Sequence, residues 1–272
     1  MTHPIGAMIL AAGRGERMRP LSDTTPKPLL EAGGKPLIVW QIEALARAGF
    51  SDIVVNAAHL QQKFVEALGD GARYGVSLHW SFEPVPLEVA GGIATALPLL
   101  PPGPALIVAG DVYTAFDYTS FRRRAEAMAG DASGARAHLV LVPNPPYHLE
   151  GDFALVDGRV ALDGGPRHTY ASIGVYDTAL FHELPRGSPL KMLPYLQRWI
   201  AEGRVSGETF AGAWANVGSP EDLAQLDAAL RLGAAGRGDA QCGDVHNDAN
   251  VVDSPREGQS GDSRTPPTVK TL

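Results

Sequence analysis

The stretch ILAAGRGERMRPL, residues 9–21, places a loop of glycines and arginines directly after a short apolar run. An apolar run of this length predicts a buried strand, and a glycine-rich loop after a strand is typical of phosphate-binding sites. The dinucleotide fingerprint Gly-x-Gly-x-x-Gly nevertheless fails here, because Met18 occupies the third glycine position. The P-loop pattern fails as well, since Pro36 follows the Gly34-Lys35 pair. Neither of these phosphate-binding motifs is present.

The same loop still has the composition of a cradle for an anion. Glycines at positions 13 and 15 allow backbone amide groups to approach a ligand closely. Positive charge comes from four nearby side chains, Arg14, Arg17, Arg19 and Lys27. A polyphosphate matches this combination. A solvated basic surface loop matches the same short motif, so the loop alone leaves both interpretations open.

Composition limits the classes of function. With 272 residues, 44% of them hydrophobic, the chain is large enough for a packed globular core. The formal net charge of -7 argues against broad adhesion to nucleic acid or to acidic lipid. Cys242 has no second cysteine with which to form a disulfide, and the histidines, His148 among them, are not spaced like metal ligands. No apolar segment is long enough for a signal peptide or a membrane span, so we expect a cytoplasmic protein without a membrane or nucleic-acid partner.

The first part of the chain alternates between strand and helix patterns. Because such alternation implies right-handed crossovers, it predicts a mostly parallel sheet with helices on both faces. The fold class is therefore a Rossmann-like, mixed α/β sheet. The predicted strands are residues 7–12, 52–57, 77–82 and 105–109, and the predicted helices are residues 37–48, 61–68 and 91–100.

The pattern then becomes more antiparallel, with short strands separated by Gly, Asp and Pro turns. We expect one domain over residues 1–232, with a first half (7–115) and a second half (116–232). Residues 233–272 contain few aliphatic side chains, which predicts a disordered tail. Predicted strands in this part are residues 137–142, 153–156, 160–162, 169–176, 205–210 and 213–217, and predicted helices are residues 121–128, 190–201 and 220–232.

Two polar residues follow predicted strands at the edge where ligands bind in such sheets. Asp111 ends the strand at 105–109, and Asn216 ends the strand at 213–217. A carboxylate beside a polyphosphate loop would repel the ligand unless a cation lay between them. Mg²⁺ takes such oxygen ligands together with substrate phosphates, so the sequence predicts magnesium at this edge. A helix or turn cap is the alternative role for Asp111 and for Asn216.

At this point the motifs resemble those of the sugar-nucleotidyltransferase family. The resemblance rests on LAAGRGERMRPLSDTTPKPLL, on GDV at residues 110–112 and on VGS after Trp214, and it covers residues 7–232. It implies an enzyme that joins a nucleoside triphosphate to a sugar 1-phosphate. Within the family the motifs GGIATALPLL, GDFAL and VSGE are most similar to uridylyltransferases of cell-wall (peptidoglycan) recycling, which implies UTP and N-acetylmuramate alpha-1-phosphate as substrates.

The resemblance implies that residues 7–115 form the nucleotide-binding half and residues 116–232 the sugar-phosphate-binding half, and it implies a role for individual residues. Arg17 would contact the leaving end of the triphosphate, Lys27 would bridge the reacting phosphates, and Asp111 with Asn216 would hold Mg²⁺. The implied nucleotide-binding residues are Ala11, Ala12, Gly13, Arg14, Gly15, Glu83, Gly91 and Gly92. The implied contacts to the sugar phosphate are Asn144, Asp152, Ser172 and Lys191.

This chain departs from the family pattern at three places. Asn216 stands where the muramate enzymes usually carry Asp, Val89-Ala90 replaces Thr-Gly, and Ala171-Ser172 replaces Ser-Gly. The Asn at position 216 implies weaker charge neutralisation at the metal site. The other two departures affect the expected identity of the base and the sugar more than the expected type of reaction.

Several alternatives therefore stay open. One is a related nucleotidylyltransferase that uses another sugar 1-phosphate or phosphocholine with GTP or CTP. Another is a catalytically silent protein that binds a nucleotide-sugar, which the Asn at position 216 favours and the retained Lys27 and Arg17 disfavour. A dinucleotide-dependent oxidoreductase is disfavoured by Met18. The chain lacks room for the additional left-handed helical domain of many relatives, so we expect a monomer or a small homo-oligomer.

Overall fold

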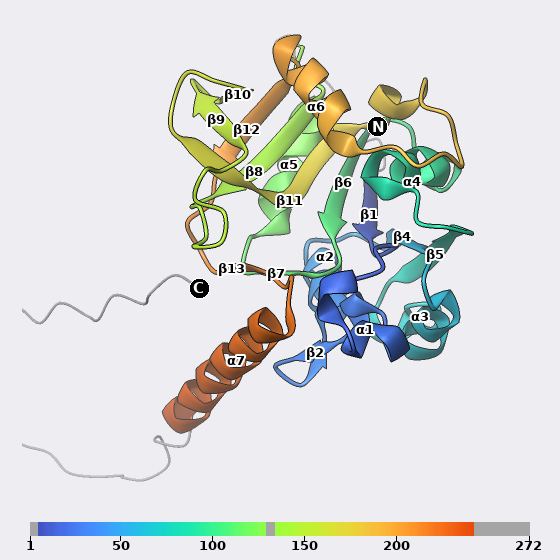
Figure 1. Cartoon of the computed structure of the whole chain (residues 1–272), viewed down its shortest axis with the longest axis vertical. Helices are drawn as coiled ribbons and strands as arrows, with labels where there is room; N and C mark the ends of the chain where they lie inside the picture. Colours follow the sequence, from blue (N-terminus) through green and yellow to red (C-terminus); the bar gives the residue numbers. More distant parts are fainter. Residues whose placement is uncertain (1–4, 129–133, 242–272) are drawn as a thin grey trace, which may run out of the picture.

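A nine-stranded mixed sheet lies at the centre of the computed structural model, which describes residues 5–128 and 134–241 (Figure 1). Its strand order is β5-β4-β1-β6-β11-β8-β12-β10-β9. The first four strands in this order are parallel to one another, as the alternating pattern predicts. Their bounds are β1 Gly6–Leu10, β4 Asp52–Ala57, β5 Ser77–Phe82 and β6 Pro104–Ala109.

Helices cover both faces of this sheet, because successive side chains of each strand point to opposite faces. On β1, Ala7 and Ile9 belong to a core cluster with α2, α3 and α5, whereas Met8 belongs to a cluster with α4 and α6. The fold class predicted from the sequence is thus confirmed. The helices are α2 Leu37–Arg47, α3 Gln61–Leu68, α4 Glu88–Ala96, α5 Tyr118–Met128 and α6 Met192–Ala201.

The second half of the sheet curls until its last strand meets β11. β9 pairs with β10 and also with the start of β11, so β11, β8, β12, β10 and β9 form a closed ring of pairings. β11 bends where its register with β8 shifts between Tyr170 and Gly174, and Ser172 in this bend has a left-handed φ of 58°. The bounds are β8 Ala137–Val142, β9 Phe153–Val156, β10 Arg159–Ala161, β11 Arg167–Asp177 and β12 Val205–Thr209.

Small elements surround the glycine-arginine loop. A two-stranded ribbon of β7 (Val112–Thr114) and β13 (Trp214–Asn216) runs beside it, and Met18, Leu37 and Val217 share a separate core cluster. The remaining short elements are α1 Leu21–Thr24, β2 Glu31–Ala32, β3 Lys35–Pro36, and the 3-10 turns at Glu16–Met18, Lys27–Leu29, Ala72–Tyr74, Leu97–Leu99 and Thr178–Phe181.

The last helix, α7 (Pro220–Gln241), corrects one prediction. The sequence predicts disorder from residue 233, but the helix continues through residues 233–241 and projects from the body of the molecule (Figure 1). This segment, GAAGRGDAQ, contains no proline to end the helix, and its three alanines favour a helix whereas its three glycines weaken it. The rest of the predicted tail, residues 242–272, lies outside the described residues. Within the described ranges, no helix is both long and apolar enough to cross a membrane.

Close packing explains why a glycine occupies position 91 of α4. The backbone amides of Ala90 and Gly91 both donate to the carbonyl of Leu190, so the helix lies directly against the segment before α6. A Cβ atom added at Gly91 would lie 2.1 Å from the backbone oxygen of Ser188. Any larger residue must therefore displace backbone.

We expect Gly91→Ala to lower the free energy of unfolding by about 1–3 kcal/mol, the usual effect of overpacking a close contact. Gly13→Ala is the matched control, because a Cβ atom there meets nothing within 4 Å and its φ is not left-handed. Thermal unfolding of both variants measures the difference. Equal stability of Gly91→Ala and the parent protein would contradict this packing argument.

Candidate active site

A cleft of about 1070 Å³ opens at the carboxyl ends of β1 and β6, where ligands bind in sheets of this type. The glycine-arginine loop forms one wall, and β11, α6 and the segment before β9 form the other. Of the predicted site residues, those that line the cleft are Ala12, Gly13, Arg14, Gly15, Arg17, Lys27, Asp111, Asp152, Ser172 and Asn216. Those that do not line it are Ala11, Glu83, Gly91, Gly92, Asn144 and Lys191.

The loop wall depends on a glycine in the left-handed region. Gly15 has a φ of 66°, and its carbonyl accepts a hydrogen bond of 2.9 Å from the amide of Met18. A Cβ atom at Gly15 would lie 3.0 Å from Cβ of Lys27. A glycine therefore allows the loop to turn tightly and brings Lys27 against it.

Lys27 and Asp111 form the strongest ion pair of this wall. Lys27 Nζ lies 2.6 Å from Asp111 Oδ2, and the lysine side chain is 11% exposed. Burial on this scale strengthens the attraction, because less water screens the two charges. Lys27 thus brings a positive charge to the cleft and balances the negative charge of the Asp111 carboxylate, two residues after β6.

Arg17 supplies a second positive charge, and among the described residues it forms no ion pair. Its guanidinium lies beside Gly218, where a Cβ atom would come within 3.2 Å of Nη2. Arg14 pairs only loosely with Glu16, at 3.9 Å. Arg14 and Arg17 therefore leave this side of the cleft able to attract an anion.

The ribbon of β7 and β13 brings the two predicted metal ligands to the same place. Asn216 pairs with Val112, the residue after Asp111, and the amide of Val217 donates to the Asp111 carbonyl at 3.1 Å. The Asn216 side chain makes no hydrogen bond with any described residue. Because a carboxylate and an amide oxygen suit a hard cation, these two residues fit Mg²⁺. The described residues hold no cluster of three or more His, Cys, Asp or Glu side chains suited to a metal, so substrate oxygens would have to complete the coordination.

Glu83 does not line the cleft, and its carboxylate instead binds the side chain of Asn56, which does line it. Its Oε1 accepts a hydrogen bond of 2.6 Å from Asn56 Nδ2, and its Oε2 accepts one of 2.8 Å from the Leu87 amide. Asn56 Oδ1 in turn accepts from the amide of Ala11 at 2.8 Å. Burial raises the pKa of the Glu83 carboxyl, and the two hydrogen bonds oppose that rise. Glu83 thus fixes Asn56, and Asn56 fixes the start of the glycine loop.

Four residues that the resemblance assigns to the nucleotide make supporting contacts within the protein, and their direct contact with a nucleotide stays a prediction. The backbone amide of Ala11 donates to Asn56 Oδ1, and Gly91 packs against the backbone of Ser188. Gly92 packs against the hydrogen-bonded side chains of Asn56 and Glu83, because a Cβ atom there would lie 2.7 Å from Asn56 Nδ2 and 2.8 Å from Glu83 Oε1. Ala11, Glu83, Gly91 and Gly92 support the wall of the cleft from behind.

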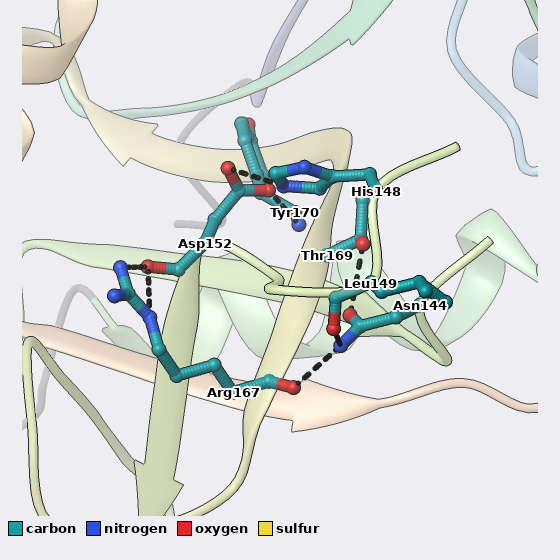
Figure 2. A network of polar contacts seen from close by, with 7 residues as sticks. All are labelled: Asn144, His148, Leu149, Asp152, Arg167, Thr169 and Tyr170. Carbon is teal, nitrogen blue, oxygen red and sulfur yellow. Dashed lines mark hydrogen bonds and ion pairs between the residues drawn. The ribbon is translucent and has the colours of Figure 1, made fainter. Parts of the chain in front are cut away.

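Asn144 has a similar supporting place on the other side (Figure 2). Its amide nitrogen donates to the carbonyls of Leu149 and Arg167 at 2.9 and 3.0 Å, and its oxygen accepts from Thr169 Oγ1 at 2.9 Å. These contacts occupy the side-chain amide, so the predicted sugar contact of Asn144 is not supported. Asn144 instead ties the segment 144–152 to the start of β11. Lys191 lies outside the cleft as well, at the residue before α6, whereas its neighbours Met192 and Leu193 line it.

Asp152 and His148 both line the cleft. Their side chains contact each other (Figure 2). Asp152 Oδ1 lies 3.2 Å from His148 Nε2, and Oδ2 accepts from the Tyr170 amide at 2.8 Å. The Tyr170 hydroxyl lies 2.8 Å from that of Tyr176, and burial raises the pKa of both phenols. Ser172 reaches the cleft from the left-handed bend of β11.

Sequence reasoning missed Asn56 and His148. Asn56 could have been found, because it lies near the carboxyl end of a predicted parallel strand, as Asp111 does. His148 gives no such signal, since it lies in an irregular segment whose course is set by Asn144. The apolar part of the cleft was missed too, and it includes Ile93, Ile107, Phe153, Met192, Leu193 and Leu196.

A family model and curated relatives both match this chain to nucleotidyltransferases. The family model described as Nucleotidyl transferase matches residues 6–147. The N-acetylmuramate alpha-1-phosphate uridylyltransferase of Neisseria meningitidis serogroup B is 48% identical over 217 residues, covering 78% of this chain and 93% of the relative. The protein of the same name from Caulobacter vibrioides is 34% identical over 244 residues, covering 84% and 97%.

Solved structures agree on the fold. A Bacillus anthracis protein described as a glucose-1-phosphate thymidylyltransferase, in complex with a sucrose, has a TM-score of 0.73 at 20% identity. The match covers 84% of this chain and 95% of that one. HddC from Yersinia pseudotuberculosis, complexed with GMP-PN, has a TM-score of 0.66 at 19% identity and covers 83% and 99%. The family match spans the glycine-arginine loop, Lys27 and Asp111, which face one another in the cleft. The chain belongs to the nucleotidyl transferase family.

Proposed function

We propose that this protein transfers UMP from UTP to N-acetylmuramate alpha-1-phosphate and releases pyrophosphate. The observation that carries the proposal is the meeting of Arg17, Lys27, Asp111 and Asn216 in one cleft. The names of the Neisseria and Caulobacter relatives support UTP and the sugar acid as substrates. Such a reaction would place the protein in peptidoglycan recycling in the cytoplasm.

The charges of the cleft suit this reaction because its nucleophile needs little activation. A phosphate monoester has a second pKa near about 6, so the sugar phosphate is already an anion at neutral pH. The main obstacles are repulsion between two anions and the charge that develops on pyrophosphate. Preorganised positive groups reduce both, and Arg17 and Lys27 are placed to do so. No general base is required.

We also propose that the reaction depends on Mg²⁺ held by Asp111 and Asn216. The bound ion would supply positive charge beside the triphosphate. The side chains themselves supply one carboxylate and one amide oxygen, which leaves room for phosphate oxygens. Lys27 would exchange its contact with Asp111 for contacts with the substrate phosphates.

Related nucleotidyltransferases with other substrates are the main alternative. Matches also include the mannose-1-phosphate guanylyltransferase of Mycobacterium tuberculosis at 26% identity. Pyrophosphate release from each of the four nucleoside triphosphates with several sugar 1-phosphates, measured with and without Mg²⁺, tests the proposal. We expect the highest kcat/KM with UTP and N-acetylmuramate alpha-1-phosphate, and only with Mg²⁺ present. Preference for another pair would refute the proposed substrates, and no turnover with any pair would favour a silent binding protein.

Lys27→Ala and Asp111→Ala should each lower kcat by about two to three powers of ten, because each removes a preorganised charge. Pyrophosphate release measures the effect, and circular dichroism checks that each variant folds. Near-normal turnover in either folded variant would count against the assignment.

Lys27→Met should raise the affinity of the nucleotide-free protein for Mn²⁺, a substitute for Mg²⁺, by about three- to tenfold. The lysine ammonium lies 2.6 Å from the carboxylate that the cation needs, so the two positive charges compete. Electron paramagnetic resonance of free Mn²⁺ measures the affinity. Lys35→Met is the control, because Lys35 pairs with Glu43 away from the cleft lining. Unchanged or weaker Mn²⁺ binding by Lys27→Met would show that the pair does not compete with a cation.

Glu83→Gln should raise the KM for UTP by about tenfold while the protein stays folded. A Gln cannot accept from both Asn56 and Leu87 without turning its own amide group toward one donor, so Asn56 loses its fixed orientation. Thr178→Val is the matched control, because it removes a buried hydroxyl that accepts from the Gly103 amide outside the cleft lining. Steady-state kinetics and thermal unfolding separate the two. Equal KM values in both variants at equal loss of stability would reduce Glu83 to a purely structural role.

A further inference from the structure

We infer that His148 binds the carboxylate of the sugar acid and so determines the preference of the cleft for an anionic over a neutral sugar 1-phosphate. This inference rests on the proposed function, and it adds the residue that recognises the acid. N-acetylmuramate alpha-1-phosphate carries two separate anionic groups, its phosphate and the carboxylate of its lactyl ether. A protein that prefers this substrate needs a second positive group, away from those that hold the phosphates.

The distribution of charge in the cleft singles out His148. The basic side chains among the described lining residues are Arg14, Arg17, Lys27 and His148. The first three belong to the glycine-arginine loop or contact Asp111, which is the side proposed for the phosphates. His148 alone among them lies on the opposite wall, where its ring and the Tyr170 amide contact the same Asp152 carboxylate. A carboxylate on the sugar can therefore find a cationic partner there only in an imidazolium ring.

The contacts of the ring leave one nitrogen for a ligand. Nε2 lies 3.2 Å from Asp152 Oδ1, so it donates to that carboxylate. The other oxygen of Asp152 accepts a hydrogen bond of 2.8 Å from the Tyr170 amide, which fixes the orientation of the carboxylate. Nδ1 forms no hydrogen bond with any described residue, and the histidine side chain is 38% exposed. Protonation of Nδ1 creates a donor for a second carboxylate, and the two carboxylates then flank one positive ring.

The segment that carries His148 is held in place before the substrate arrives (Figure 2). Asn144 bridges the Leu149 and Arg167 carbonyls, and the His148 amide donates to the Pro145 carbonyl at 2.9 Å. Gly151 has a φ of 62°, and a Cβ atom there would lie 2.8 Å from Asn144 Oδ1. Because these contacts fix the backbone on both sides of the ring, little further ordering is needed on binding.

Two acceptor substrates that differ only in the lactyl group test the inference. N-acetylmuramate alpha-1-phosphate has the carboxylate, and N-acetylglucosamine alpha-1-phosphate lacks it. The quantity to measure is the ratio of their kcat/KM values with UTP for the purified full chain. His148→Phe keeps an aromatic ring without a proton donor, and we expect it to lower this ratio by about ten- to a hundredfold. His148→Lys retains a positive charge and should keep most of the ratio.

His79→Phe is the matched control. His79 forms a similar pair with Asp52, at 3.0 Å, but it lies on the edge strand β5 outside the cleft lining. This variant should leave the ratio unchanged. Circular dichroism confirms that each variant is folded.

The outcomes separate this inference from the proposed function. If the parent protein prefers the acid and His148→Phe keeps that preference, the proposed function holds and His148 is not the recognising residue. If His148→Lys loses the preference as fully as His148→Phe, the charge of the side chain is not what the site uses, and the inference is overturned. If the parent protein shows no preference for the acid, the proposed sugar is wrong and the inference falls with it.

Discussion

The contact between Lys27 and Asp111 is the constraint on which the cleft depends. A site for two phosphorylated substrates must gather positive charge without leaving it uncompensated in the free protein. The 2.6 Å ion pair achieves this, because Asp111 balances the lysine until an anionic ligand can replace it. Two further groups line the same cleft: Arg17, which lies beside Gly218 and forms no ion pair within the described residues, and Asn216 on the neighbouring ribbon.

Both walls of the cleft are held from behind by fully used polar side chains. Behind the glycine-arginine loop, Glu83 orients Asn56, which fixes the Ala11 amide. On the opposite wall, Asn144 ties its segment to β11. The buried pair of Glu83 and Asn56 is an effective support because any loosening leaves an unsatisfied donor or acceptor, and the half-buried Asn144 makes three hydrogen bonds at once. The residues that face the ligand can therefore lie on loops and still be well positioned.

Much of the fold could be predicted from the sequence, because its strands and helices have clear periodicities. The helix at 61–68 and the strands at 52–57 and 77–82 have the bounds expected. The placement of Asp111 and Asn216 at one edge could be predicted as well, since Asp111 follows β6 by two residues and Asn216 ends β13. What the sequence could not give is the direction of side chains near that edge. Glu83 and Asn144 have the residue types of ligand-binding groups, and only tertiary packing decides that they hold the chain instead. The closure of β9 onto β11 depends likewise on the bend at Ser172, which no local pattern indicates.

A crystal structure with Mg²⁺ and a non-hydrolysable UTP analogue would show whether the glycine-arginine loop and the ends of β6 and β13 converge on one triphosphate. We expect phosphate oxygens within hydrogen-bond distance of Arg17 and Lys27, and Lys27 Nζ withdrawn from Asp111 in favour of them. A triphosphate bound elsewhere, or a Lys27 contact with Asp111 left intact beside the bound nucleotide, would refute this arrangement.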